Sequence, residues 1–159
     1  MHVGAIAAGA SSDVVDAFTT FATQLGVAFQ IQDDVLNLAG SSGYGKETAG
    51  DLWEGKHTLI LIHTMRCASE CDRARAHRIL AKPRQPEPET SRPAKTSDEV
   101  AFLRDLVDRH DGIGYASRVA ERRAARAGRS LQTIAGRLAP SAHVDFLRGL
   151  VDFTVRRTH

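Results

Sequence analysis

A long hydrophobic stretch that carries two adjacent carboxylates constrains the fold more than any other part of the chain. It includes "GVAFQIQDDVLNLAG" at residues 26–40, and apolar residues at helical spacing before and within it predict one helix from about Asp13 to Asn37. A helix that is apolar around nearly its whole circumference is normally buried. We therefore expect it to lie inside an all-α protein, with these large residues at helical spacing: Phe18, Phe21, Leu25, Phe29 and Leu36.

One polar stripe interrupts the apolar surface of this helix. Its members fall within an arc of about 100° and are Gln30, Asp33, Asp34 and Asn37. The rest of the circumference is apolar except at Gln32, so we expect the stripe to face an internal cavity rather than open water. Because ionised carboxylates are costly to bury alone, the two aspartates need a positive partner.

The residues by themselves leave two kinds of partner open. Lys46 and Lys56 follow in a glycine-rich segment at residues 40–56, which lacks an apolar period and is predicted to be a long loop. In one interpretation these lysines form structural ion pairs with the aspartates. In the other, the carboxylate and amide oxygens bind Mg²⁺, which completes its shell with water and phosphate, and the lysines hold the same phosphates.

The remaining chain is predicted to be helical, without strands or internal repeats. Proline-rich sequence indicates an exposed loop, and a Thr-x-x-Glu pattern indicates a helix start. The predicted elements are a helix over 57–71, a short helical segment to Leu80, a Pro-rich loop at about 82–95, a helix capped by Thr96 and Glu99 that ends at Asp111-Gly112, a helix over 113–138 and a last helix from Pro140.

Composition narrows the class of protein. A length of 159 residues allows one ordinary domain, and a net charge of +2 is too small to indicate a nucleic-acid-binding protein. Two cysteines are too few for a disulfide scaffold, which predicts a cytoplasmic location. We expect no transmembrane segment, because no uninterrupted run of about 18 apolar residues occurs.

The motifs resemble a known family. "AFQIQDDVLN" followed by "GKETAGDLWEGKHTL" is similar to the second aspartate-rich region of the trans-isoprenyl diphosphate synthases, or polyprenyl synthetases. The resemblance implies an isoprenoid-synthase-type helical fold around a deep cavity. It also implies a prenyltransferase that condenses an allylic diphosphate with isopentenyl diphosphate and uses Mg²⁺.

The resemblance also assigns roles to residues. Asp33, Asp34 and Asn37 match the metal-binding positions, and Gln30 matches a position beside the diphosphate. Lys46 and Lys56 match lysines that contact the diphosphate, and Asp51 matches a loop aspartate that supports the ligands. The implied catalytic residues are Asp33, Asp34, Lys46 and Lys56.

The chain departs from the family pattern in several ways. Asn37 replaces a usual third aspartate, which removes a charge, Ala49 replaces a usual glycine, and Ile60 replaces a frequent proline. Family members are longer, and their first aspartate-rich motif and their isopentenyl-diphosphate-binding residues lie in an N-terminal half. We therefore expect residues 1–159 to be the C-terminal half of a polyprenyl synthetase domain that is inactive alone. It would associate with itself or with a chain that supplies the other half.

Two alternatives and three weaker features complete the sequence-based predictions. The alternative function is a non-catalytic, degenerate partner subunit of a prenyl synthase, or a truncated gene product. The weaker features are a His63, Cys67 and Cys71 face, interpreted as structural or incidental; arginines 118, 122, 123 and 126, interpreted as a solvated face; and Arg156 with Arg157, interpreted as a solvated tail.

Overall fold

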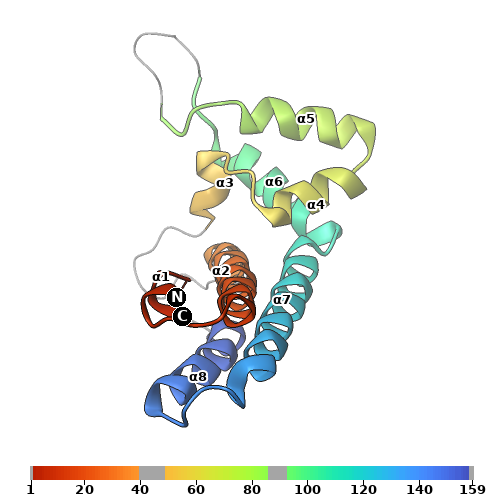
Figure 1. The fold of residues 1–159 in the computed structure, drawn as a ribbon. Coiled ribbons are helices and arrows are strands. Elements are labelled where there is room, and N and C mark those ends of the chain that lie inside the picture. Colours follow the sequence, from red (N-terminus) through yellow and green to blue (C-terminus); the bar gives the residue numbers. More distant parts are fainter. Residues whose placement is uncertain (1, 40–48, 86–92, 158–159) are drawn as a thin grey trace. The chain divides into compact units, whose positions relative to one another are not determined.

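A computed structural model of the protein describes residues 2–39, 49–85 and 93–157. All regular secondary structure in these ranges is helical, which confirms the all-α prediction (Figure 1). By their internal contacts the described residues form two compact units: unit 1 comprises those within 2–32 and 118–157, and unit 2 comprises those within 33–117. The helices are α1 (His2–Ala7), α2 (Ser12–Ala39), α3 (Gly50–Glu54), α4 (Leu59–Cys67), α5 (Glu70–Leu80), α6 (Ser97–Arg109), α7 (Gly112–Ala135) and α8 (Ala142–Arg156).

Unit 1 has a core in which α2, α7 and α8 pack together. Small residues on α7 allow close approach: a Cβ atom added at Gly128 would lie 3.6 Å from Val151 Cγ1 on α8. The Ser130 hydroxyl donates a hydrogen bond to the Ala17 carbonyl on α2 at 2.8 Å. The buried members of this core are Val14, Phe21 and Leu25 of α2 and Ala127, Leu131 and Ile134 of α7, and Leu147, Leu150 and Val151 of α8 pack against them.

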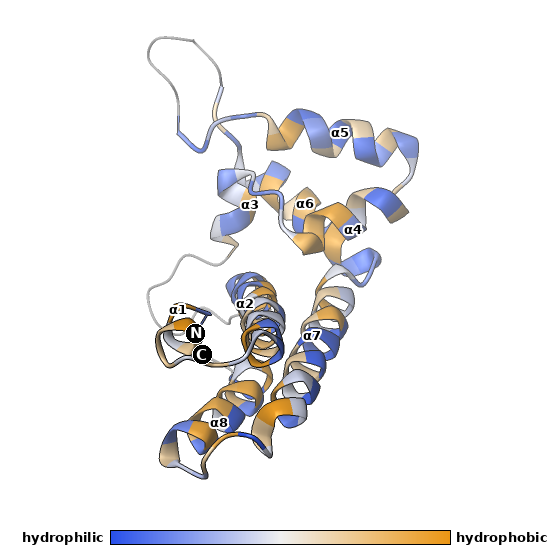
Figure 2. Cartoon of the chain, in the orientation of Figure 1, coloured by the Kyte–Doolittle hydropathy of each residue, from blue (hydrophilic) through white to orange (hydrophobic). Residues whose placement is uncertain are grey.

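Unit 2 is organised around α6. Helices α3, α4 and α5 each contact α6, whose buried face carries Leu103, Leu106 and Val107. The predicted capping box is confirmed: Thr96 Oγ1 accepts from the Glu99 N–H at 3.3 Å, and the Glu99 carboxylate accepts from the Thr96 N–H at 3.1 Å. Figure 2 shows α4 as mainly hydrophobic and α5 as rich in hydrophilic residues, so α5 covers the unit with a polar outer face.

The helix predicted over residues 57–71 is two helices. Helix α4 ends at Cys67. The Ser69 hydroxyl then caps α5 by accepting a hydrogen bond from the Asp72 backbone N–H at 3.1 Å. This local capping bond ends the continuous helix that apolar spacing alone predicted. Helices α7 and α8 were placed within a few residues of their observed bounds.

The long loop predicted at residues 40–56 is wrong for its last part, since residues 50–54 form α3. Leu52 on α3 is fully buried, and the short helix contacts α5 and α6. Tertiary burial of one leucine therefore stabilises a helix that is too short to form alone. Residues 40–48 lie outside the described residues.

Both described ends of the Pro-rich segment are anchored. The Lys95 N–H donates to the Pro83 carbonyl at 3.1 Å, and the buried Lys95 ammonium donates to the Lys82 carbonyl. The Lys82 ammonium pairs with Glu99 at 2.5 Å. Residues 86–92 of the predicted loop lie outside the described residues.

Helix α2 is more exposed than predicted. It confirms the predicted helix over 13–37, yet Val27 and Phe29 are each 39% exposed, and Gln30 is also exposed. These side chains are not enclosed by unit 1, so the expectation of burial all round is wrong here. By length and composition α2 also meets the criterion for a membrane span, which core helices of soluble proteins meet as well. The predicted absence of a transmembrane segment therefore stays a prediction.

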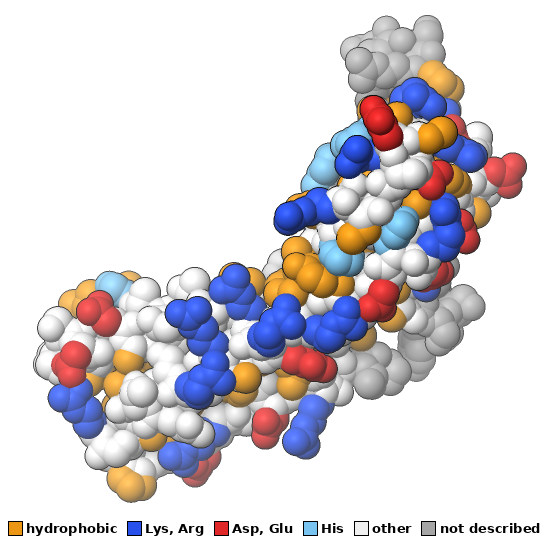
Figure 3. Space-filling view, turned by 90° about the vertical axis from the view of Figure 1, so that its right-hand side faces the viewer, with side chains coloured by type: hydrophobic (Ala, Val, Ile, Leu, Met, Phe, Trp, Pro, Cys, Tyr) orange, Lys and Arg blue, Asp and Glu red, His pale blue; other side chains and the backbone are white. Residues whose placement is uncertain are grey.

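The arginines of α7 lie on its polar side. Arg118, Arg122, Arg123 and Arg126 are all exposed, as a solvated face requires. Figure 3 shows Lys and Arg side chains spread over one face with Asp and Glu side chains between them. Arg123 donates to Gln24 on α2 at 3.0 Å. This dispersal favours the solvated-face interpretation.

Candidate functional site

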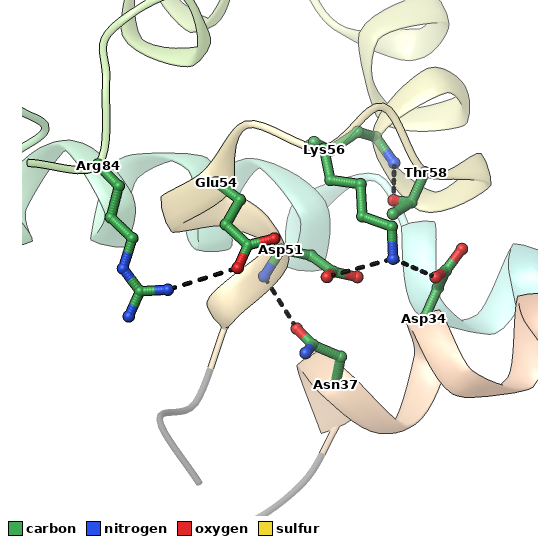
Figure 4. Close-up of polar contacts among 8 residues, drawn as sticks. Asp34, Asn37, Asp51, Glu54, Lys56, Thr58 and Arg84 are labelled. Carbon is green, nitrogen blue, oxygen red and sulfur yellow. Dashed lines mark hydrogen bonds and ion pairs between the residues drawn. The ribbon is translucent and has the colours of Figure 1, made fainter.

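The C-terminal part of α2 and the segment around α3 bring one lysine to two carboxylates in unit 2. Lys56 Nζ donates to Asp34 Oδ1 at 3.1 Å and to Asp51 Oδ1 at 3.4 Å, and Figure 4 shows it between them. The Asp34 and Asp51 side chains are only 10% and 9% exposed, whereas the Lys56 side chain is 47% exposed. An ammonium group thus lies at the outer side of a buried carboxylate pair.

The backbone turn after α3 determines where Lys56 lies. Gly55 adopts a left-handed conformation with φ 73°. Its N–H donates to the Leu52 carbonyl at 3.2 Å, and the Lys56 N–H donates to the Asp51 carbonyl at 2.9 Å. This pair of bonds is a Schellman motif, a common helix C-terminus that strongly favours glycine.

Thr58 starts the next element of the site. Its N–H donates to the Lys56 carbonyl at 2.9 Å, and its hydroxyl accepts from the Leu61 N–H at 3.4 Å at the beginning of α4. Thr58 is buried, so the hydroxyl satisfies a helix N–H that water does not reach. The Lys-x-Thr spacing therefore joins the end of one helix to the cap of the next.

Asn37 connects α2 to the start of α3. Its side-chain oxygen accepts from the Asp51 N–H at 3.1 Å, and its backbone carbonyl accepts from the Ala49 N–H at 3.4 Å. Ala49 has φ 67° and ψ 32°, in the left-handed region that favours glycine. The departure from glycine noted at this position is therefore a strained one.

Replacing Ala49 with glycine is expected to raise the unfolding free energy by about 0.5–1 kcal/mol, because the relief of left-handed strain exceeds the added entropy of the unfolded chain. Urea denaturation followed by circular dichroism measures the change. The control is Ala139→Gly at an exposed position outside the helices and without positive φ, where glycine should only destabilise. A loss of stability in both variants would contradict the expected strain at Ala49.

Burial and neighbouring charges shift the pKa values of two groups in the site, Asp51 and Lys56. Burial raises the pKa of Asp51, the positive charge of Lys56 opposes that rise, and the Asp34 carboxylate adds to it. The hydrogen bond to Asp34 raises the pKa of Lys56, although burial opposes this. Within the described part of the chain, Asp51 Oδ2 is buried without a hydrogen-bond partner.

These residues fit a divalent cation that is completed by other ligands. The carboxylates of Asp34 and Asp51 share one ammonium, and an orphaned carboxylate oxygen is a hard donor of the kind Mg²⁺ prefers. Among the described residues, however, no three His, Cys, Asp or Glu side chains converge on one point. A magnesium ion here would therefore need water and phosphate oxygens in its shell.

The structure brings together four of the predicted site residues: Asp34, Asn37, Asp51 and Lys56. Asp33 is half-buried beside Asp34 on α2, and Gln30 is exposed on the preceding turn. Lys46 lies outside the described residues. The predicted metal and diphosphate roles stay predictions, since proximity alone is also what structural ion pairing requires.

Comparison with known proteins identifies the family. Residues 1–95 match the family model described as polyprenyl synthetase. The chain is a member of the polyprenyl synthetase family. A geranylgeranyl diphosphate synthase from Sulfolobus acidocaldarius is 29% identical over 156 residues, which are 98% of this chain and 43% of that protein.

Solved structures agree with the polyprenyl synthetase assignment and confirm the isoprenoid-synthase-type helical fold. A decaprenyl diphosphate synthase from Rhodobacter capsulatus is similar with a TM-score of 0.78 at 28% identity, over 99% of this chain and 45% of that one. A second similar structure is a geranylgeranyl pyrophosphate synthase from Corynebacterium glutamicum, complexed with calcium and isoprenyl diphosphate. Its TM-score is 0.72 at 27% identity, over 99% of this chain and 44% of that one. The chain thus spans less than half the length of these polyprenyl synthetase relatives.

Sequence reasoning missed several residues that position this polyprenyl synthetase site. Gly55 and Thr58 lie within the family motif but received no structural role, although a glycine after a short apolar segment is a helix-end signal. Arg104 on α6 donates to the Leu38 carbonyl near the end of α2 and also pairs with Asp108 at 3.0 Å. No local pattern indicates this contact, because it joins residues that are far apart in the sequence.

The structure also bears on two of the weaker features. Cys71 is not on the helix of His63 and Cys67, since it belongs to α5, and the His63 ring stacks on Tyr115 at 3.8 Å between centroids. This stacking gives His63 a structural role. The prediction of a solvated tail is wrong for Arg157. Its guanidinium lies 3.8 Å from the centroid of the Phe29 ring and donates a hydrogen bond to the Phe29 carbonyl at 3.2 Å.

Proposed function

We propose that this chain carries the Mg²⁺-dependent diphosphate-binding part of a prenyltransferase site. In that proposal it belongs to an enzyme that condenses an allylic diphosphate with isopentenyl diphosphate. The observation that supports it is the buried Asp34 and Asp51 pair bridged by the half-exposed Lys56. The Corynebacterium glutamicum relative, described as complexed with calcium and isoprenyl diphosphate, adds support, because it pairs a divalent cation with this ligand class.

Each residue would have a defined task. Asp33 and Asp34 would hold Mg²⁺, which when bound supplies Lewis-acid stabilisation of the departing diphosphate. Lys56 would direct a fixed positive charge at the same group, since Asp34 and Asp51 restrain its ammonium. The Lys56 ammonium is charged at neutral pH, and its hydrogen bond to Asp34 raises its pKa further. Lys46 and Gln30 would add further contacts to the diphosphate.

Assembly is a further part of the proposal. Val27 and Phe29 present an exposed apolar arc on α2, and association with another chain or copy would bury it. A cytoplasmic location and turnover that depends on such assembly complete the proposed function. The competing interpretation keeps Asp34, Asp51 and Lys56 as a structural ion-pair network with no ligand.

Calorimetric titration with inorganic diphosphate, with and without Mg²⁺, separates these interpretations. We expect the unaltered chain to bind diphosphate roughly tenfold or more tightly when Mg²⁺ is present. Replacing Asp33 and Asp34 together by asparagine should abolish that dependence and leave helicity by circular dichroism nearly unchanged. The reason is that asparagine keeps the shape of each side chain and removes the charge that attracts the metal.

The matched control makes the same charge change on α8. Asp145 and Asp152 are both exposed there, and their double replacement by asparagine should leave the Mg²⁺ dependence intact. Equal diphosphate binding by all three proteins, with and without Mg²⁺, would show that the aspartates of α2 are structural and would overturn the proposal.

A further inference from the structure

We propose that Asn37 acts as a positioning residue that caps α3 from α2, and not as a third metal ligand. This inference rests on the proposed function for its catalytic meaning, although the capping contact itself is independent of that function. It changes the role assigned to Asn37 by family resemblance, where the position belongs to the metal-binding motif.

The first step is the need for a cap. Helix α3 has only five residues, and Ala49 at its N-cap provides no side-chain hydrogen bond. The Leu52 and Trp53 N–H groups both bond to the Ala49 carbonyl at 3.0 and 3.2 Å. The Asp51 N–H has no such partner within α3, and the Asn37 side chain supplies one at 3.1 Å.

The second step is the orientation of the Asn37 amide. An N–H donor requires an acceptor, so the side-chain oxygen must face Asp51 and the NH₂ group must face away from it. That NH₂ nitrogen lies 3.6 Å from where a Cβ on Gly50 would be, and the Asn37 carbonyl accepts from the Ala49 N–H. One residue of α2 thus accepts hydrogen bonds from two residues at the start of α3, Ala49 and Asp51.

The third step links the cap to the chemistry. Asp51 carries the buried carboxylate that holds Lys56, and its backbone carbonyl accepts the Lys56 N–H at 2.9 Å. Releasing the Asp51 backbone would therefore move both the carboxylate and the ammonium group. An uncharged amide makes this connection without adding a third negative charge beside Asp34 and Asp51. Burial already raises the pKa of Asp51, and the Asp34 charge adds to that rise.

The experiment compares Asn37→Ala, Asn37→Asp and a control, Gln32→Ala, which removes a half-buried amide elsewhere on α2. The hydrogen-exchange rate of the Asp51 backbone amide, followed by NMR, measures directly whether its N–H is protected by the cap. Asn37 is the single asparagine of the chain, so selective labelling also gives one resolvable side-chain amide. Titration with inorganic diphosphate and Mg²⁺ measures the Mg²⁺-dependent affinity of the site.

For Asn37→Ala we expect Asp51 exchange to become about fivefold faster, since a lost cap exposes the N–H. We also expect Mg²⁺-dependent diphosphate affinity to weaken by roughly tenfold, as when a supporting residue of a metal site is removed. Asn37→Asp keeps an acceptor, so it should preserve slow exchange and change the affinity by less than about threefold. Gln32→Ala should change neither.

Two results would overturn the inference. One is unchanged Asp51 exchange in Asn37→Ala, which would mean that the amide does not cap α3. The other is more than about threefold tighter Mg²⁺-dependent binding in Asn37→Asp with weakened binding in Asn37→Ala, the pattern of a metal ligand. If the unaltered chain shows no Mg²⁺-dependent binding, the proposed function fails, whereas the exchange measurement still decides the cap.

Discussion

Replacing Gly55 with alanine is expected to lower the unfolding free energy by about 2–4 kcal/mol, the largest stability effect among the substitutions considered. An alanine Cβ there would lie 2.6 Å from the Leu80 carbonyl oxygen, a backbone atom that cannot turn aside. The φ angle of 73° adds strain for any residue with a side chain. Urea denaturation followed by circular dichroism measures the loss.

Gly26 provides a matched control for this substitution. It lies inside α2 with nothing within 4 Å of an added Cβ, so Gly26→Ala should raise stability by about 0.5–1 kcal/mol through helix propensity. The same chemical change therefore has opposite expected signs at the two positions. A stabilising or neutral effect of Gly55→Ala would show that the turn before Lys56 does not require glycine.

Replacing Lys56 with methionine is expected to destabilise the protein at neutral pH by about 1–2 kcal/mol and to abolish Mg²⁺-dependent diphosphate binding. The change leaves the buried carboxylates of Asp34 and Asp51 without their shared cation. The estimate is below the full cost of an unpaired buried charge, because the Lys56 side chain is 47% exposed and its interactions are screened by water.

The pH dependence of stability tests this explanation. Burial raises the pKa of Asp51 above its ordinary 3.8, so its ionisation in the folded state costs stability as pH rises from 3.8 through the raised value. Removing Lys56 should enlarge that loss. The difference in unfolding free energy between Lys56→Met and the unaltered protein should therefore shrink on acidification toward pH 4. Since the pKa of Lys56 is raised above 10.5, its stabilising contribution should also be lost as pH rises above that value.

The measurement is the unfolding free energy from pH 4 to 11 for Lys56→Met and the unaltered chain. Arg66→Met is the control, because Arg66 is an exposed cation of α4 without an ion pair in the described residues. Its stability difference should not depend on pH in this way. A gap for Lys56→Met that stayed constant across the whole pH range would contradict the role of Asp51.

Some properties of this protein are determined by the sequence itself. Helix α2 follows from apolar spacing, and the start of α6 follows from the Thr96 and Glu99 capping box, because both signals act within a few residues. The order of Asp33, Asp34 and Lys56 within a long motif likewise indicated the polyprenyl synthetase family. Chemistry at fixed short spacing can be read without the fold.

Only the tertiary structure decided the geometry of the candidate site. Lys56 contacts Asp34 across 22 residues, and this depends on α3, which forms because Leu52 is buried and Gly55 ends the helix. The contact of Asn37 with Asp51 depends on the same path of the chain. Such contacts join segments that are distant in the sequence, and their energies come from packing and burial, which no local spacing encodes.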